Sequence, residues 1–309
     1  MIEQRSVDEA APVTLIEVSP RDGLQNESRI LATADKVDLI CRAVASGIRR
    51  IEVASFVNPR RVPQMADAEA VVAALPPLPG VEKIGLVLNA RGAARALAAG
   101  IDELGIVCVA SDPFGLRNQG QTIEESVIMA CALLAEARRQ GRSAQVTIAV
   151  AFGCPLAGPV PAARVVEIAR RLAACCPREI ALADTVGIAR PAEVRALVGL
   201  AGRAVAPVPL RVHFHDTRGT GIANVVAAVE AGVTRVDASI AGIGGCPFAP
   251  GAAGNVATED VVYALGGRVA LDLDRLVATA RHLSALLGRA PASALARLGL
   301  EASGERRAG

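Results

Sequence analysis

The stretch that decides the fold is Val13-Thr14-Leu15-Ile16-Glu17-Val18, followed directly by Ser19-Pro20-Arg21-Asp22-Gly23. Its first part is rich in β-branched and apolar residues, which is typical of a buried strand. Its second part lacks the Gly-x-Gly-x-x-Gly turn that follows the first strand of a dinucleotide-binding fold. We therefore expect a parallel α/β architecture of another kind.

Similar apolar runs recur along the chain at spacings of roughly 20 to 40 residues, the length of a strand, a helix and their loops. Longer helical segments separate these runs. Eight strand–helix repeats without a large shift in composition predict a closed (β/α)8 TIM barrel rather than an open doubly wound sheet. The eight expected strands are Val13–Val18, Arg50–Ala54, Lys83–Leu88, Glu103–Val109, Val146–Ala151, Glu179–Ala183, Leu210–His215 and Arg235–Ile240.

Helix boundaries carry ordinary sequence signals. Thr33 is expected to cap a helix that stops at Gly47, and Pro191 suits a first helical turn. A helix at Ala223–Ala231 is expected to close at Gly232.

The whole chain, residues 1–309, is expected to form a single catalytic domain. The barrel would span about residues 12–268, and two extra C-terminal helices, Asp272–Leu287 and Pro291–Leu298, would fill about 272–299. Residues 301–309 are polar and are expected to fray.

The composition excludes several classes of protein. Hydrophobic residues make up 52% of the 309, so disorder is excluded for most of the chain. A net charge of +2 and an aromatic content of 2% argue against nucleic acid as a partner. The charge-free stretch at residues 145–163 is interrupted by prolines and glycines, so we expect a strand and a loop there and no membrane span.

The cysteines and the N-terminus point to a cytoplasmic protein. The seven cysteines are odd in number and scattered, which predicts reduced thiols. Residues 1–12 lack the basic start and apolar core of a secretory signal. Cys41, Cys131, Cys175 and Cys176 fall in helical segments and are expected to be small core residues, while Cys108 and Cys154 stay undecided.

Two of the three histidines, His213 and His215, lie two residues apart at the end of an expected strand. Side chains at i and i+2 of a strand point to the same face, and in a barrel that face is the interior. Active sites form where barrel strands end. Two such imidazoles can hold one cation, although two buried structural histidines are the alternative.

The turn after the first strand places Arg21 and Asp22 at the same barrel mouth. Asp22 could complete a mixed nitrogen and oxygen site suited to Mg²⁺ or Mn²⁺, and Asn255 could add a side-chain oxygen. Arg21 could neutralise negative charge on a substrate oxygen. A surface turn with a local ion pair is the alternative.

Two acidic residues, Glu52 and Asp184, lie in or at the end of otherwise apolar strands. They are candidates for general base and substrate positioning, against a purely structural role. Glu52 is expected either inside the barrel or at its bottom.

A glycine-rich loop, Ala241-Gly242-Ile243-Gly244-Gly245-Cys246-Pro247, follows the eighth strand. It resembles a lid that delivers a thiol, although such a loop can instead cradle a phosphate.

These motifs together resemble the 3-hydroxy-3-methylglutaryl-CoA lyase family. The resemblance covers nearly the whole chain up to about Leu287. It rests on His-x-His-Asp and on the segments Pro20–Glu27, Ser55–Val57, Val62–Asp67 and Gly244–Pro247.

The resemblance implies a metal-dependent TIM-barrel lyase that cleaves an acyl-CoA substrate to acetyl-CoA and, for the parent substrate, acetoacetate. It implies roles in leucine degradation and ketone-body formation, and a homodimer. Its metal ligands match Asp22, His213, His215 and Asn255, for Mg²⁺ or Mn²⁺. Its catalytic residues match Arg21, Asp22, Glu52, Asp184 and Cys246. Gln25 and Ser55, within the shared motifs, are expected to contact the CoA thioester.

Several positions depart from the familiar members of this family. Ser28 replaces a lysine and Thr147 replaces a tyrosine, while Phe248 and Pro250 differ within the glycine-rich loop. A related 3-hydroxy-3-alkyl acyl-CoA is therefore open as the substrate. Two other functions also remain open: a synthase of the same metal-barrel group, which joins acetyl-CoA to a 2-oxo acid, and a non-catalytic binding protein on the same fold.

Overall fold

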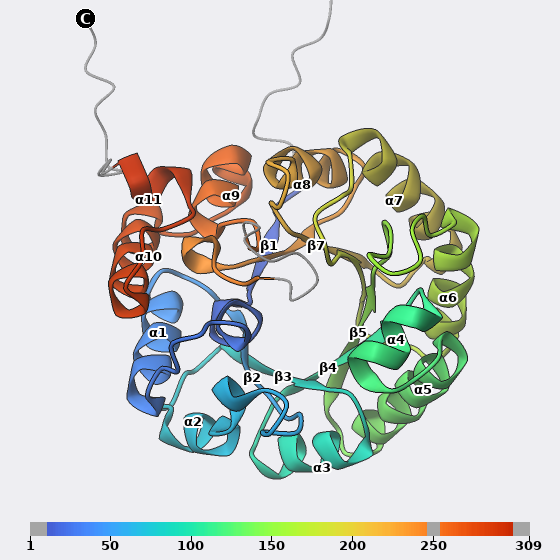
Figure 1. Cartoon of the computed structure of the whole chain (residues 1–309), viewed down its shortest axis with the longest axis horizontal. Coiled ribbons are helices and arrows are strands. Elements are labelled where there is room, and N and C mark those ends of the chain that lie inside the picture. Colours follow the sequence, from blue (N-terminus) through green and yellow to red (C-terminus); the bar gives the residue numbers. More distant parts are fainter. Residues whose placement is uncertain (1–10, 246–253, 299–309) are drawn as a thin grey trace, which may run out of the picture.

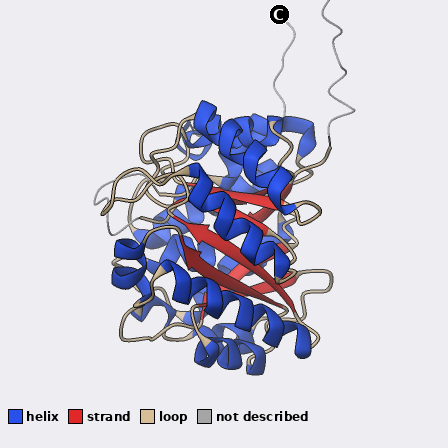
Figure 2. Cartoon of the chain, turned by 90° about the vertical axis from the view of Figure 1, so that its right-hand side faces the viewer, coloured by secondary structure: helices blue, strands red, loops and turns tan. Residues whose placement is uncertain are grey.

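The computed structural model describes residues 11–245 and 254–298. Within them, eight parallel strands close into a barrel in sequence order, and the first strand pairs with the last. Figure 1 looks down this barrel, and Figure 2 shows its strands running obliquely between the helices. The strands are β1 Thr14–Glu17, β2 Arg50–Ser55, β3 Glu82–Val87, β4 Glu103–Val109, β5 Ser143–Ala149, β6 Ile180–Asp184, β7 Leu210–Phe214 and β8 Arg235–Ala238.

The helices form a ring outside the strands (Figure 1). Four short helical turns lie between the longer elements: η2 Ser19–Gly23, which is a π turn, and the 3-10 turns η3 Pro63–Met65, η4 Ile240–Gly242 and η5 Gly266–Arg268. The α-helices are α1 Thr33–Ala45, α2 Ala68–Ala74, α3 Ala90–Ala98, α4 Asp112–Gln119, α5 Ile123–Arg139, α6 Ala162–Ala174, α7 Pro191–Val205, α8 Gly221–Glu230, α9 Thr258–Leu265, α10 Leu273–Leu287 and α11 Ala294–Leu298.

The predicted TIM barrel is confirmed, and most helix boundaries lie close to the expected ones. Pro191 is the first residue of α7, and α10 and α11 are the two extra helices. The prediction that Thr33 caps α1 is wrong. Ala32 occupies the cap position, and Thr33 is the first residue of the helix. The Thr33 hydroxyl donates to Asp67 at 2.7 Å and so connects α1 to the segment before α2.

The outer faces of the strands pack against the helices in one large apolar core. The inner face is different. Ile16, Val18 and Ile84 form only a small separate apolar cluster. Buried charged side chains occupy much of the remaining inner face, including Arg50 and Arg211. The barrel interior is therefore partly ionic, whereas branched aliphatic residues dominate most TIM barrels.

The prediction of reduced thiols is wrong for Cys131 and Cys175, and the prediction of a core position is wrong for Cys176. Cys131 in α5 and Cys175 after α6 form a disulfide with a Cα–Cα distance of 5.6 Å, because the two helices bring them together across 44 residues. Cys176 is exposed and has a positive φ, since it lies in the turn that ends α6. Cys41 is half-buried, and Cys108 and Cys154 are both buried free thiols.

Among residues 11–245 and 254–298, no helix has the length and apolarity that crossing a membrane requires. The stretch at 145–163 is the end of β5, a loop and the start of α6, as expected.

Candidate metal centre and active site

Three predicted metal ligands meet at the carboxyl ends of the strands. Asp22 lies in the turn η2 after β1, while His213 is in β7 and His215 follows it directly. The Nε2 atoms of both histidines lie 3.9 Å from Asp22 Oδ2. One ligand atom from each residue falls within 4.8 Å of the others, so the three side chains can hold one ion.

Asn255, which lies between η4 and α9, is also part of this group. It forms an isolated antiparallel bridge with His215, and its Nδ2 donates to Asp22 Oδ2 at 2.8 Å. Its Oδ1 is buried and has no hydrogen-bond partner in the structure. A buried amide oxygen normally has a partner. Because hard divalent cations prefer oxygen ligands, an ion beside this atom fits the site.

The pKa values of the cluster reflect its opposite charges. Burial alone would raise the pKa of Asp22, but Arg21 and the two histidines hold it below its usual range. Burial, together with the neighbouring charge of His213, lowers the pKa of His215 to about 4. An ionised carboxylate and a neutral imidazole are the forms that bind a metal.

Arg21 lies between the two carboxylates of this mouth. Its Nε donates to Glu52 Oε2 at 2.7 Å and its Nη1 donates to Asp22 Oδ1 at 2.6 Å. Gln25 Nε2 also donates to Asp22 Oδ1, at 3.1 Å. Glu52 is therefore inside the barrel at the end that carries Asp22, and not at the bottom. The guanidinium is largely buried, with 9% of the residue exposed.

Asp184 lies at the end of β6, as predicted, and Ser55 is the last residue of β2. Both Asp184 oxygens accept backbone N–H groups, from Ile188 at 3.0 Å and from Ala189 at 2.9 Å. Burial raises the pKa of Asp184 in spite of these bonds. The Ser55 hydroxyl is buried without a hydrogen-bond partner in the structure. Asp184 thus orders the loop after β6, whatever else it does.

The glycine-rich loop begins beside the metal ligands. Gly244 has a φ of +114°, and a Cβ on it would lie 2.5 Å from Asn255 Nδ2. Glycine is required here for both reasons. Cys246, Phe248 and Pro250 lie outside the described residues.

Asp237 is a site residue that the sequence analysis did not find. It lies in β8, and its Oδ2 is 3.2 Å from Nδ1 of His213. The available signal was a carboxylate in the middle of an expected strand, Arg235–Ile240, of the same kind that drew attention to Glu52.

Comparison with known proteins agrees with this geometry. The HMGL-like family model matches residues 12–285. The mitochondrial hydroxymethylglutaryl-CoA lyase of Arabidopsis thaliana is 42% identical over 90% of this chain, which spans only 60% of that protein. The (R)-citramalyl-CoA lyase of Chloroflexus aurantiacus is 41% identical over 90% of this chain and 92% of that protein.

A solved structure supports the same conclusion. The HMG-CoA lyase of Acinetobacter baumannii, in complex with coenzyme A and 3-methylmalate, has a TM-score of 0.89 and 37% identity over 94% of this chain and 96% of that one. The chain belongs to the HMGL-like family and is an enzyme of the hydroxymethylglutaryl-CoA lyase type.

Proposed function

We propose that this enzyme cleaves 3-hydroxy-3-methylglutaryl-CoA, or a close 3-hydroxy-3-alkyl acyl-CoA, to acetyl-CoA and acetoacetate or the matching keto acid. The observation that carries the proposal is the convergence of Asp22, His213 and His215 on one point, with Arg21 against them. A non-catalytic barrel would not need this set of side chains.

We propose Mg²⁺ or Mn²⁺ as the cofactor, held by these three residues and by Asn255. Two imidazoles and two oxygen donors suit such an ion. When bound, the metal supplies a Lewis acid that polarises and orients oxygen atoms of the substrate. The unpartnered Oδ1 of Asn255 supports its place in the ligand set.

The remaining residues carry the bond cleavage. A base takes the proton of the 3-hydroxyl, the C2–C3 bond breaks, and its electron pair passes to C2 as a thioester enolate while C3 becomes the ketone. Arg21 faces the metal ligands and offers donors that stabilise the enolate oxygen. Glu52 fixes the guanidinium through Nε and leaves it aimed at the mouth. Protonation at C2 then gives acetyl-CoA.

The proton-transfer groups are assigned by resemblance. We propose that Asp184 contacts the substrate on the side of the base, where burial raises the pKa of its carboxyl above the usual range. By the same resemblance, we propose that Cys246 takes part in the protonation of C2. Gln25 and Ser55 are proposed contacts of the CoA thioester, and the unpartnered Ser55 hydroxyl supports this for Ser55.

The second candidate substrate is citramalyl-CoA, because a relative of equal identity bears that name. Thr147 bears on the choice. Its hydroxyl accepts from Arg211 at 2.9 Å, so it is held by the barrel interior. We propose that threonine in place of the larger tyrosine changes the shape of the acyl pocket.

One experiment tests both substrates. The purified enzyme with Mg²⁺ is incubated with 3-hydroxy-3-methylglutaryl-CoA, longer 3-alkyl analogues and citramalyl-CoA, and the release of acetyl-CoA is measured. We expect acetyl-CoA release from 3-hydroxy-3-methylglutaryl-CoA and its 3-alkyl analogues. Without metal we expect no release from any substrate. Condensation of acetyl-CoA with a 2-oxo acid, with no C–C cleavage of any of these acyl-CoA substrates, would instead identify a synthase.

The homodimer and the cytoplasmic location are also proposals, supported by the family resemblance. Light scattering after gel filtration tests the first and cell fractionation tests the second.

A further inference from the structure

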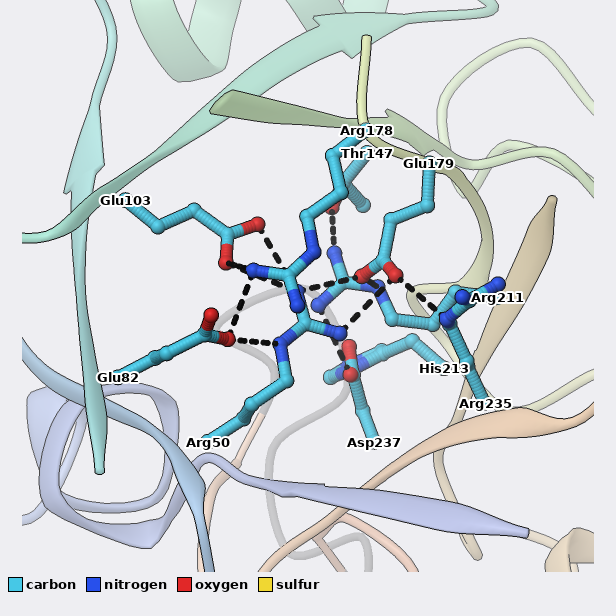
Figure 3. Close-up of polar contacts among 10 residues, drawn as sticks. All are labelled: Arg50, Glu82, Glu103, Thr147, Arg178, Glu179, Arg211, His213, Arg235 and Asp237. Carbon is cyan, nitrogen blue, oxygen red and sulfur yellow. Dashed lines mark hydrogen bonds and ion pairs between the residues drawn. The ribbon is translucent and has the colours of Figure 1, made fainter. Parts of the chain in front are cut away.

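A chain of buried charged side chains runs through the barrel interior and ends on a metal ligand (Figure 3). At one end of this chain of charges, Nδ1 of His213 lies 3.2 Å from Asp237 Oδ2. The other oxygen of the same carboxylate, Oδ1, accepts from Arg211 Nη1 at 3.0 Å. Both oxygens of Asp237 are thus engaged, one by the ligand and one by a guanidinium.

Arg211 is itself fixed on several sides. It is fully buried, and its Nη2 donates to Thr147 Oγ1 at 2.9 Å. Its Nε lies 3.4 Å from Glu179 Oε1. Glu179, also fully buried, accepts from Arg50 at 3.0 Å on both oxygens and pairs with Arg235 at 3.1 Å. The guanidinium therefore has little freedom to move away from Asp237.

We propose that Asp237, clamped by Arg211, is a positioning residue that orients His213 for metal binding; the inference rests on the metal site proposed above. In this role the carboxylate accepts a hydrogen bond from Nδ1–H, so the imidazole keeps its lone pair on Nε2, which faces Asp22. Partners of this kind fix both the tautomer and the ring orientation of a ligating histidine.

The two histidines are unequal in this respect. Nδ1 of His215 is buried and has no hydrogen-bond partner in the structure, whereas Nδ1 of His213 has a carboxylate. If the carboxylate were present only because a buried histidine needs a hydrogen-bond partner, Nδ1 of both histidines would have one. The anchored ligand is the one connected to the ionic interior, so the alignment of the site depends on residues that never contact the substrate.

Metal affinity measured directly, by calorimetric titration of Mn²⁺ into the full chain, tests this role. We expect Asp237→Ala to weaken binding by about 10- to 100-fold, the usual cost of losing such a partner. Asp237→Asn should lose less, because its amide oxygen still accepts from Nδ1. Arg211→Met should also weaken Mn²⁺ binding, although it substitutes none of the four proposed ligands.

Glu103→Gln is the matched control. Glu103 is an equally buried interior carboxylate that pairs with Arg50 at 2.8 Å, but it lies at the start of β4 and contacts no ligand. We expect this variant to lose stability in thermal unfolding and to keep the wild-type affinity for Mn²⁺. Titrations are made well below the unfolding temperature of each variant, and the folded Asp237→Asn protein replaces Asp237→Ala if the latter does not fold.

The outcomes separate the two proposals. If His213→Ala binds Mn²⁺ as tightly as the wild type, the metal site itself is wrong. If His213→Ala loses binding but Asp237→Ala and Asp237→Asn bind within threefold of wild type, only the positioning role is overturned. An equal loss of affinity in Glu103→Gln also overturns it, because general loosening of the interior would then explain the effect.

Discussion

Arg21 links Asp22, at the mouth of the barrel, to Glu52 in strand β2. Its guanidinium contacts Asp22 on one side and Glu52 on the other, and opposite charges on both sides hold its position. A guanidinium fixed in advance costs no reorganisation when charge develops on the substrate, which is where electrostatic catalysis gains most. Lysine could not make both contacts in this geometry.

We therefore expect Arg21→Ala to lower kcat by about 100-fold or more, the cost of one transition-state donor. Metal binding should persist, since the arginine is not a ligand. Steady-state kinetics and Mn²⁺ titration measure the two effects.

The control for this change is Arg171→Ala, which removes an exposed arginine paired with Glu124 on the outer helices. It should turn over normally. Near-normal turnover in Arg21→Ala would remove the arginine from the mechanism.

At the scale of elements, periodicity predicted all eight strands, with ends displaced by at most three residues and β4 predicted without displacement. β5 begins at Ser143 and not at Val146, because Gln145 is buried inside the barrel although it is polar. The short helix α4 was not predicted. The interior ion pairs were also missed, since Arg50 meets Glu179 across 129 residues, and no local pattern can indicate such a pairing.

The site was predicted where motifs are local and missed where they are not. His213 and His215 are two residues apart, and alternation alone placed them together. Asp237 became recognisable only when the register of β7 against β8 set it beside His213.

The loop after β8 depends on a glycine at Gly244. We expect Gly244→Ala to weaken Mn²⁺ binding by at least tenfold, because the new methyl would displace Asn255 and the φ of +114° is strained for alanine. Gly245→Ala is a matched control, since a Cβ there meets nothing within 4 Å. Equal affinities in the two variants would contradict the predicted displacement of Asn255.

The turn η4 is held by Glu259, which is fully buried and accepts from the backbone N–H of Ala241 at 3.1 Å. Burial raises its pKa to about 8, from an ordinary value of 4.5. The folded state therefore favours the neutral acid. Its contribution to stability is complete below pH 4.5 and is lost as the pH rises through about 8.

We expect the free energy of unfolding of the wild type to fall between pH 5 and pH 8, relative to Glu259→Gln, by up to about 1.4 kcal/mol per pH unit. Urea unfolding of both proteins in EDTA at several pH values gives the difference. Parallel curves would show that this carboxyl is not the source.

At the scale of the whole molecule, the barrel encloses a set of paired charges between its two ends (Figure 3). Buried ion pairs add little net stability, yet removal of one partner is costly. Such an interior tolerates few substitutions and holds the strands in one register. A metal bound at the proposed site would add stability at the open end.

A saturating metal should raise the free energy of unfolding by about 2.7 kcal/mol at 100 times its dissociation constant. Chelation with EDTA should lower the melting temperature accordingly, and added Mn²⁺ should restore it. His213→Ala is the control and should respond to neither. A melting temperature unchanged by EDTA in metal-loaded enzyme would contradict binding at this site.

The pairing of β1 with β8 has a consequence for how the enzyme matures during synthesis. Asp22 and Asn255 come from opposite sides of that seam and are 233 residues apart in the chain. A nascent chain whose eighth strand is still inside the ribosome has Asp22 outside it but not yet Asn255. The proposed ligand set is thus completed only late in synthesis, so a metal bound by all four residues would mark a chain whose barrel has closed.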